Sequence, residues 1–472
     1  MKIYKRIFFV CALLLVFTGI FIPTEAEGIS IEKEEELSRE FLSVVFRYYK
    51  VIDAPIIVNY INHLGQKILS AFPPQPFKYH FYVIKDDSLN AFASPAGHIF
   101  VNSGLIQAMK SEEELAGVIS HEIAHASLRH ISKKIEQSKK TSMATLAGIA
   151  AGVLLGIGGA GDAAGAVIMG TTAAGQTSAL AYSRDNEAEA DQVGLKYLNR
   201  VGYSAKGLLE VMKKMRGKEW FDSSVIPTYM RTHPAPEERM VNIDIWIEKH
   251  EQVQTNFDPY PFQRTRTWLV ASYGDEQAAL TQFQADITRN RKNSLAYFGY
   301  SLSLARSGNY DDAIDQMRKA LEINAFEPYF VIGLGRIYFL AGRYPEALNI
   351  LVSLESLARN HPRRLYYLGR TQMKMGRYHD AIDALEKTIR LYPKYTSAYQ
   401  YLGMSYGKLD KLSYAHYYLG IYYKRIASLK NADFHLQRAF AMMKDPGKRD
   451  EIEKMLGEVH LKRAQLRKGS RH

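Results

Sequence analysis

The residues best suited to chemistry in this 472-residue chain are His121, Glu122 and His125, which form the pattern His-Glu-x-x-His. They lie inside a helical pattern that runs from Glu112 to Ile131 and follows an expected N-cap at Ser111. Residues four apart lie one turn apart on the same helix face, so both imidazoles can reach one cation. Glu122 lies next to His121 on the same side of the helix, where it can contact a water molecule bound to the cation. The pattern predicts a catalytic metal centre, although it also arises by chance and needs support from the rest of the chain.

A catalytic zinc ion needs a third protein ligand and one position left open for water. The position six residues after His125 is occupied by Ile131, which excludes a third histidine at that spacing. His130 lies nine residues after His121, which corresponds to the opposite side of a continuous helix. We therefore expect His130 to be a surface residue, and the third ligand must come from another segment.

An acidic segment from Ser183 to Asp191 offers the missing ligand. Glu187 and Asp191 are four residues apart and share one helix face, whereas Glu189 points elsewhere. From the residues alone, Glu187 and Glu189 remain alternatives for the third ligand. An ordinary acidic helix start is a further interpretation, because acidic side chains are favourable near helix N-termini.

The two segments together resemble the HtpX and CAAX prenyl-protease family of zinc metallopeptidases, in which His-Glu-x-x-His is followed by Glu-x-x-x-Asp on a second helix. The resemblance implies that one Zn²⁺ per chain is held by His121, His125 and Glu187. It also implies that Asp191 orients a ligand histidine and that Glu122 acts as the general base.

Two further segments match this family. One is the strand motif around residues 90–92 and 97–101, which in such enzymes pairs with an extended substrate. The other is the run at residues 232–239, which contains His233. The resemblance implies that His233 lies near the metal, where it either stabilises the tetrahedral oxyanion or occupies the open metal position. A structural histidine before a proline turn is the alternative.

The elements that must position these residues are mostly helical. Apolar residues recur at helical spacing from 32 to 69, with Pro55 as a break, so two helices are expected there. Residues 79–84 and 97–101 are rich in strand-forming side chains, with a loop expected at 90–95. The predicted fold class is mostly α, with a helical zincin-like metallopeptidase domain that carries a small β-sheet, followed by an α-solenoid.

The solenoid is predicted from a period of 34 residues. Gly-x-Tyr turns recur at this spacing at 308–310, 342–344 and 376–378. This period, with small residues where helices touch, is typical of tetratricopeptide repeats (TPR). Four repeats are expected, at 294–327, 328–361, 362–395 and 396–429. A degenerate unit is expected before them and a charged helix pair after them. Such a stack binds peptide segments or another protein on its concave face, unless it serves only as a scaffold that packs on its neighbouring domain.

The N-terminus has the features of a secretory signal peptide. Lys2, Lys5 and Arg6 precede a charge-free apolar run at 7–23. An uncleaved membrane anchor is the alternative. The sequence thus predicts three parts: a signal peptide at 1–26, a zinc metallopeptidase domain at 27–259, and a TPR domain with C-terminal capping helices at 260–468.

Composition and charge exclude several classes of protein. Cys11 is the sole cysteine, so an intrachain disulfide and a cysteine-ligated zinc finger are both excluded. The net charge of +12 is uneven, because residues 261–472 carry +14 and residues 1–260 carry −2. The basic part is suited to an acidic protein or an anionic membrane face. No groove-reading motif supports a nucleic-acid partner.

One apolar segment remains between the two metal motifs. Residues 144–175 are rich in Ala, Gly and Leu and are interrupted by one charge, at Asp162. The length suggests a membrane span. The glycine content instead favours a helical hairpin over the active site that makes peripheral contact with a membrane.

The combination of signal peptide, peptidase motif and repeats resembles periplasmic peptidases of the BepA type. It implies a secreted zinc endopeptidase that hydrolyses misfolded or stalled envelope proteins, with repeats that dock the client or the outer-membrane protein assembly machinery. The main alternative is a chaperone or assembly adaptor with a latent peptidase. A repeat scaffold without a bound metal is the third possibility.

Overall fold

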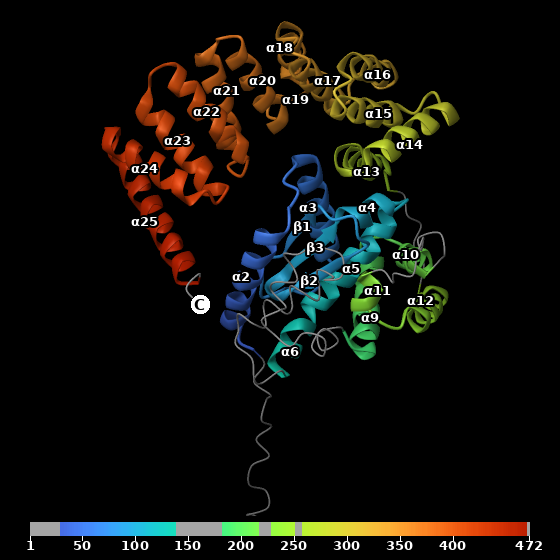
Figure 1. Cartoon of the computed structure of the whole chain (residues 1–472). Coiled ribbons are helices and arrows are strands. Elements are labelled where there is room, and N and C mark those ends of the chain that lie inside the picture. Colours follow the sequence, from blue (N-terminus) through green and yellow to red (C-terminus); the bar gives the residue numbers. More distant parts are fainter. Residues whose placement is uncertain (1–28, 138–181, 217–227, 251–256, 470–472) are drawn as a thin grey trace, which may run out of the picture.

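The computed structural model describes residues 29–137, 182–216, 228–250 and 257–469 (Figure 1). Helices dominate, with one small sheet near the N-terminus and an arc of helix pairs that follows. The predicted fold class is thereby confirmed. The predicted signal peptide and the apolar segment at 144–175 lie outside the described residues. Within the described ranges, no helix is long and apolar enough to cross a membrane.

Nine helices of the described ranges form the N-terminal part. They are α2 (Ile31–Tyr48), α3 (Pro55–Leu69), α4 (Ser103–Ala108), α5 (Glu112–Ser127), α6 (His130–Gln137), α9 (Arg184–Arg200), α10 (Lys206–Arg216), α11 (Thr228–Thr232) and α12 (Pro236–His250). The two helices expected between residues 32 and 69 are α2 and α3, and α3 begins with Pro55 in its first turn. Helix α5 is buried over most of its length, which makes it the central helix of this part.

The sheet has three strands, β1 (His80–Ile84), β2 (Ala91–Ser94) and β3 (His98–Asn102), in the order β1-β3-β2. Strand β1 runs parallel to β3, and β2 runs antiparallel to it. The residue pattern predicted a loop at 90–95, which is wrong for residues 91–94. These residues have little intrinsic strand preference, and the pairing comes from tertiary contact, including Phe92 stacked on Phe100 at 5.0 Å between ring centres. Strand β2 therefore forms one edge of the sheet.

Thirteen helices of the described ranges build the arc. They are α13 (Tyr260–Tyr273), α14 (Glu276–Arg289), α15 (Ser294–Arg306), α16 (Tyr310–Ile323), α17 (Pro328–Leu340), α18 (Tyr344–Ser353), α19 (Glu355–Ala358), α20 (Pro362–Lys374), α21 (Tyr378–Leu391), α22 (Thr396–Lys408), α23 (Leu412–Arg425), α24 (Leu429–Met442) and α25 (Pro446–Gly469). Helices α15, α17, α20 and α22 begin at the first residues of the four expected repeats.

The repeated glycines have a physical cause in the turns between paired helices. Gly308, Gly342 and Gly376 adopt positive φ angles of 85°, 75° and 75°, a conformation that favours glycine. One period later, Asp410 adopts φ 59° at the same turn, as the aspartates and asparagines of such turns can. The 34-residue spacing therefore arises because the turn of each of these helix pairs contains one residue in the left-handed backbone conformation.

The arc begins against the N-terminal part and curls over the end of the molecule that carries α3 (Figure 1). Helix α13 packs on α3 and α4. Arg266 of α13 donates a hydrogen bond from Nε to the Gln107 carbonyl at 2.8 Å. The first helix of the arc is thus anchored on the N-terminal part.

Candidate metal centre

Helix α5 carries the first three candidate residues. It begins at the expected N-cap, where the Ser111 side chain accepts a hydrogen bond from the Glu114 backbone at 3.3 Å. His121, Glu122 and His125 are each no more than 1 % exposed, because the helix passes through the middle of the domain. The fixed helix geometry brings the two imidazole rings within 4.5 Å of each other.

Helix α9 brings the acidic segment against α5. Its start is fixed by Ser183 and Asn186, whose side chains bond each other's backbone N–H groups. A Cβ atom at Gly194 would lie 3.2 Å from the Ser120 carbonyl oxygen, so glycine permits the close crossing of the two helices. The Ser120 hydroxyl also donates to the Gly194 carbonyl at 2.8 Å. Glu187, one turn into α9, consequently faces the histidines of α5.

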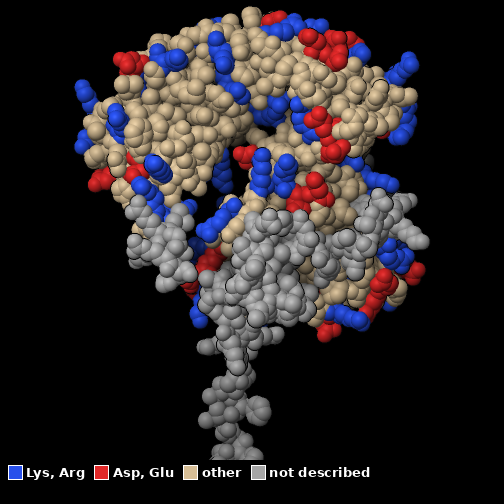
Figure 2. Space-filling model, viewed as in Figure 1, with Lys and Arg blue, Asp and Glu red and all other residues tan. Residues whose placement is uncertain are grey.

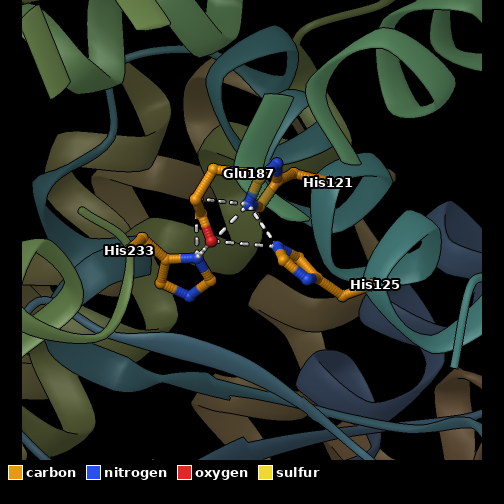
Figure 3. Close-up of side chains that lie close together, drawn as sticks. All are labelled: His121, His125, Glu187 and His233. Atoms are coloured by element: carbon orange, nitrogen blue, oxygen red, sulfur yellow. Dashed lines mark hydrogen bonds and ion pairs between the residues drawn. The ribbon is translucent and has the colours of Figure 1, made fainter. Parts of the chain in front are cut away.

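Four side chains converge at this crossing: His121, His125, Glu187 and His233 (Figure 3). Their potential ligand atoms all lie within 4.8 Å of one another. Glu187 oxygens lie 3.4 Å from Nε2 of His121 and 3.3 Å from Nε2 of His125. The two Nε2 atoms are 3.0 Å apart. Of the two glutamates that the residues left open, Glu187 is the one in this cluster.

His233 enters the cluster from the turn between α11 and α12. Its Nδ1 lies 3.1 Å from Oε1 of Glu187 and 3.3 Å from Nε2 of His121. Its ring stacks on Tyr229 at 4.2 Å between ring centres, with an angle of 19° between the planes. His233 is 1 % exposed, so its ring is held on both sides rather than free in solvent.

Asp191 lies behind the cluster and contacts His121 on the other side of its ring. Its Oδ1 is 2.9 Å from Nδ1 of His121, which assigns the ring proton to Nδ1 and leaves a lone pair on Nε2. Burial and Arg239 oppose protonation of His121, but hydrogen bonds to Asp191 and Glu187 outweigh them and raise its pKa to about 9.

Arg239 of α12 is the main residue that sequence reasoning missed. Its Nε and Nη2 donate to the two oxygens of Asp191, each at 2.8 Å, and its Nη1 pairs with Glu187. Burial raises the pKa of Glu187, but the charges of His233 and Arg239 outweigh it and hold that pKa well below its ordinary value. The available signal was an arginine six residues after His233 in an otherwise acidic helix start.

His130 is not a surface residue, which corrects the expectation from helix geometry. Helix α5 ends at Ser127, Arg129 adopts φ 57°, and a new helix begins at His130. The break turns His130 back to the site, where it is 2 % exposed and its Nδ1 lies 2.9 Å from Nδ1 of His125. A rotation counted along one continuous helix could not anticipate this.

Glu189 completes a chain of contacts from solvent to His125. Its Oε2 lies 3.2 Å from Nε2 of His130, so that nitrogen donates and Nδ1 of His130 accepts. Nδ1 of His125 then carries the donated proton, and its Nε2 presents a lone pair to the cluster. Glu189 does point away from the cluster, as expected, but it is connected to it through His130.

Glu122 faces the cluster without joining it. Its Oε1 lies 3.5 Å from Nε2 of His233. Burial raises its pKa, while the nearby His233 and His121 act in the opposite direction. Helix α5 packs on β2, so the edge strand lies next to the helix that carries Glu122. A carboxylate in this position is suited to exchange a proton with a group held between the cluster and the strand.

The donor set fits a divalent cation of the zinc type. Bonds from zinc to nitrogen or oxygen are about 2.0–2.1 Å long, so tetrahedral ligand atoms are about 3.3–3.4 Å apart. The five individual distances given above are 3.0–3.4 Å, with Oε2 of Glu187 measured to His121 and Oε1 measured to His125 and His233. Three neutral imidazoles and one carboxylate are ordinary ligands for such an ion.

Comparison with protein families supports the resemblance. Residues 59–247 match the model of peptidase family M48, and residues 274–328 match a tetratricopeptide repeat model. Residues 306–388 match the model described as anaphase-promoting complex, cyclosome, subunit 3. The chain thus matches an M48 peptidase model and, after it, a tetratricopeptide repeat model, in the order that the sequence motifs predicted.

Three curated relatives show the extent of the similarity. The chain is 26% identical over 322 residues to the beta-barrel assembly-enhancing protease of Yersinia pestis, which covers 66% of this chain and 62% of that protein. It is 26% identical over 336 residues to the protein of the same name from Escherichia coli K12, covering 70% and 68%. It is 26% identical over 201 residues to the mitochondrial metalloendopeptidase OMA1 of Schizosaccharomyces pombe, covering 43% and 56%.

Proposed function

We propose that this chain is a secreted zinc-dependent endopeptidase that hydrolyses peptide bonds of misfolded or stalled envelope and outer-membrane proteins. The observation that carries the proposal is the convergence of His121, His125 and Glu187 beside a buried Glu122. The matched M48 domain and the names of the relatives support the same activity. The predicted signal peptide supports a periplasmic location.

In the proposed site, one zinc ion is held by His121, His125 and Glu187. When bound, it supplies Lewis-acid polarisation of the scissile carbonyl and activation of water. Asp191 holds the His121 ring through Nδ1, and His130 does the same for His125, so both rings present Nε2 to the ion. Arg239 balances the two buried carboxylates of α9.

Glu122 is the proposed general base. It accepts a proton from the attacking water and passes it to the leaving amine nitrogen. The substrate is proposed to add as an extended strand at the edge of β2, since this strand packs on the helix that carries Glu122. Backbone pairing holds the peptide without selecting a sequence, which suits unfolded clients.

His233 is proposed to occupy the fourth position of the zinc ion in the resting protein. Its Nδ1 lies as close to Glu187 as the other histidine nitrogens do, which supports this role over that of an oxyanion donor. A substrate must then displace His233 from the site. The resting enzyme is therefore expected to have low peptidase activity.

The repeats are proposed to dock a client or the outer-membrane protein assembly machinery. The positive charge of the chain is concentrated in residues 261–472, which supports recognition of an acidic protein. The segment at 144–175 is proposed to touch the membrane peripherally. No nucleic-acid role is proposed.

The test is the Glu122→Gln variant, which keeps the shape of the side chain but cannot act as a base. We expect zinc content near one ion per chain and a loss of casein hydrolysis of about 10²-fold or more. Retained hydrolysis by the pure variant would reject the role of Glu122. Absence of zinc from the wild-type protein would reject the enzyme proposal.

The alternative function is a chaperone or assembly adaptor with a latent peptidase. The place of His233 in the cluster, with its Nδ1 3.1 Å from Oε1 of Glu187, supports this alternative. Expression of the Glu122→Gln protein in cells that lack the wild type separates the two. Restored envelope integrity favours the adaptor, and failure to restore it favours the peptidase.

A further inference from the structure

Three arginines of the repeats gather around one buried tyrosine. Arg336 of α17 donates from Nε to the Tyr367 hydroxyl at 3.1 Å. The Arg370 guanidinium lies 4.4 Å from the ring centres of both Phe339 and Tyr401, and 5.5 Å from that of Tyr367. Together with Arg363 of α20, these side chains form what we call the arginine cluster (Arg336, Arg363 and Arg370).

Among the residues that the structure describes, the arginine cluster has no carboxylate partner. The neighbouring Arg264 and Arg364 form ion pairs with Glu327 and Glu355, whereas within the described residues no carboxylate oxygen lies within 4.0 Å of Arg336, Arg363 or Arg370. The Nε atom of Arg370 is buried and has no hydrogen-bond partner among the described residues. Aromatic faces offset part of the cost of half-burying three like charges, but they do not satisfy the N–H donors.

Tyr367 lies at the centre of the arginine cluster, in a positive electrostatic environment. Burial raises the pKa of Tyr367, yet the charges of Arg336, Arg363 and Arg370 outweigh it, and the net shift is downward. Most of the other buried tyrosines of the repeats, such as Tyr366 and Tyr406, have raised pKa values. An anion near Tyr367 is therefore favoured.

Arg363 of the arginine cluster faces the N-terminal part of the molecule. Arg363 and Tyr367 line a cavity of about 180 Å³ together with Asp53, Pro55 and Trp268. Asp53 is an acidic group in this lining, but it is not paired with Arg363. Figure 2 shows Lys and Arg side chains around the hollow between the arc and the N-terminal part. An extended peptide can enter such a hollow, whereas a flat bilayer cannot.

We propose that the arginine cluster is a binding site for an acidic, extended polypeptide segment, whose carboxylates pair with Arg336, Arg363 and Arg370. Guanidinium groups bind carboxylates through two parallel hydrogen bonds, and the adjacent rings can pack on the intervening peptide. The inference deepens the proposed docking role of the repeats and rests on it for the identity of the client class.

The repeat geometry predicts the spacing of the acidic residues. Arg336 and Arg370 occupy equivalent positions on the neighbouring helices α17 and α20, 34 residues apart. Packed helices lie about 8–10 Å apart. An extended chain in the polyproline II conformation advances about 3.1 Å per residue with three residues per turn, so every third side chain lies on the same side. Carboxylates about three residues apart, as in Glu-x-x-Glu, therefore match the two arginines.

The test uses the full-length Glu122→Gln protein loaded with zinc, so that the probe is bound but not cleaved. The probe is a fluorescein-labelled 12-residue peptide with Glu at every third position, and its control has Gln at those positions. Fluorescence anisotropy in moderate salt is expected to show binding of the Glu peptide that is at least about tenfold tighter than that of the Gln peptide. Equal binding of the two peptides would overturn the proposal, whether or not the wild-type protein hydrolyses casein.

Variants locate the site. The double variant Arg336→Gln/Arg370→Gln should bind the Glu peptide about tenfold more weakly. Arg318→Gln is the matched control, because Arg318 of α16 also donates to a tyrosine hydroxyl, Tyr338 at 2.8 Å, but lies outside the cluster. Unchanged binding by the double variant would overturn the proposal, as would binding of phosphatidylglycerol vesicles through the same arginines without binding of the peptide.

Chemical footprinting of arginine side chains tests the same site without the double variant, in case that variant does not fold. Phenylglyoxal modifies accessible arginines, and mass spectrometry reports each site in the Glu122→Gln protein. The Glu peptide should slow modification of Arg336 and Arg370 and leave Arg318 unchanged. Equal modification with and without the peptide would overturn the proposal.

Discussion

Arg239 grips Asp191 through two parallel hydrogen bonds, each 2.8 Å long, at a point where both side chains are buried. Asp191 in turn contacts His121, and Arg239 also pairs with Glu187. One arginine therefore holds both carboxylates that α9 contributes to the site.

Replacement of Arg239 by Ala is expected to weaken zinc binding by about 10–100-fold, the usual cost of losing a group that orients metal ligands. It leaves two buried carboxylates without their counter-charge, which should lower the free energy of unfolding of the metal-free protein by about 3–5 kcal/mol. Chelator competition measures the first effect and urea unfolding the second.

Arg184→Ala is the matched control for Arg239. Arg184 pairs with Glu238 across the same two helices at 3.9 Å, but both side chains are largely exposed. Its loss should change stability by less than about 0.5 kcal/mol. Equal effects of the two variants on zinc affinity would show that Arg239 does not act through Asp191 and Glu187.

Replacement of His130 by Ala removes the partner of Nδ1 of His125. We expect zinc affinity to fall by about 10–100-fold, because the His125 ring loses the contact that fixes its orientation and tautomer. Glu189→Gln should have a smaller effect, since Glu189 is half-exposed and acts one contact further away. Unchanged zinc affinity in His130→Ala, measured by chelator competition on folded protein, contradicts the assignment.

His233→Ala tests the proposed resting state. If His233 occupies the fourth zinc position, the variant should cleave casein severalfold faster than the wild type and bind zinc more weakly, since one ligand is lost. A fall in turnover with unchanged zinc affinity would instead assign His233 to the oxyanion. Initial rates at saturating zinc, together with chelator competition, distinguish these outcomes.

The sequence allowed the helical elements and the pairing of His121 with His125 to be predicted because both follow local rules. Glu187 was singled out over Glu189 only by the family resemblance. Spacing of four placed His121 beside His125, and the 34-residue period gave the starts of α15, α17, α20 and α22. These relations depend on helix geometry, which a short stretch of sequence determines by itself.

The residues that were missed depend on contacts between distant segments. His130 reaches His125 only because the chain breaks at Arg129, and residues 91–94 become a strand only because β3 lies beside them. Arg239 joins the site from α12 through the packing of α9 and α12. None of these relations has a periodic signal, so the residue pattern alone could not show them.

Acid pH is predicted to destabilise the fold through three histidines outside the metal cluster: His98, His361 and His435. Burial is the largest cause, and it lowers the pKa of each to about 4. Nearby positive charge adds to this shift: His80 acts on His98, Arg363 and Arg264 act on His361, and His416 acts on His435. The ordinary value of 6.5 applies to the unfolded chain. Between pH 6.5 and pH 4 the unfolded chain therefore binds protons that the folded chain does not, and stability falls as the pH falls through this window.

His361→Gln isolates one of these contributions. The variant cannot take up the proton, so its loss of stability between pH 7 and pH 5 should be smaller than that of the wild type by about 1 kcal/mol, after allowance for partial exposure. His379→Gln, at an exposed position on α21, is the control and should follow the wild type. Urea unfolding of the three metal-free proteins at both pH values gives the comparison. Parallel pH dependence of all three would show that His361 does not titrate in this window, and the destabilisation would then have to come from other buried groups.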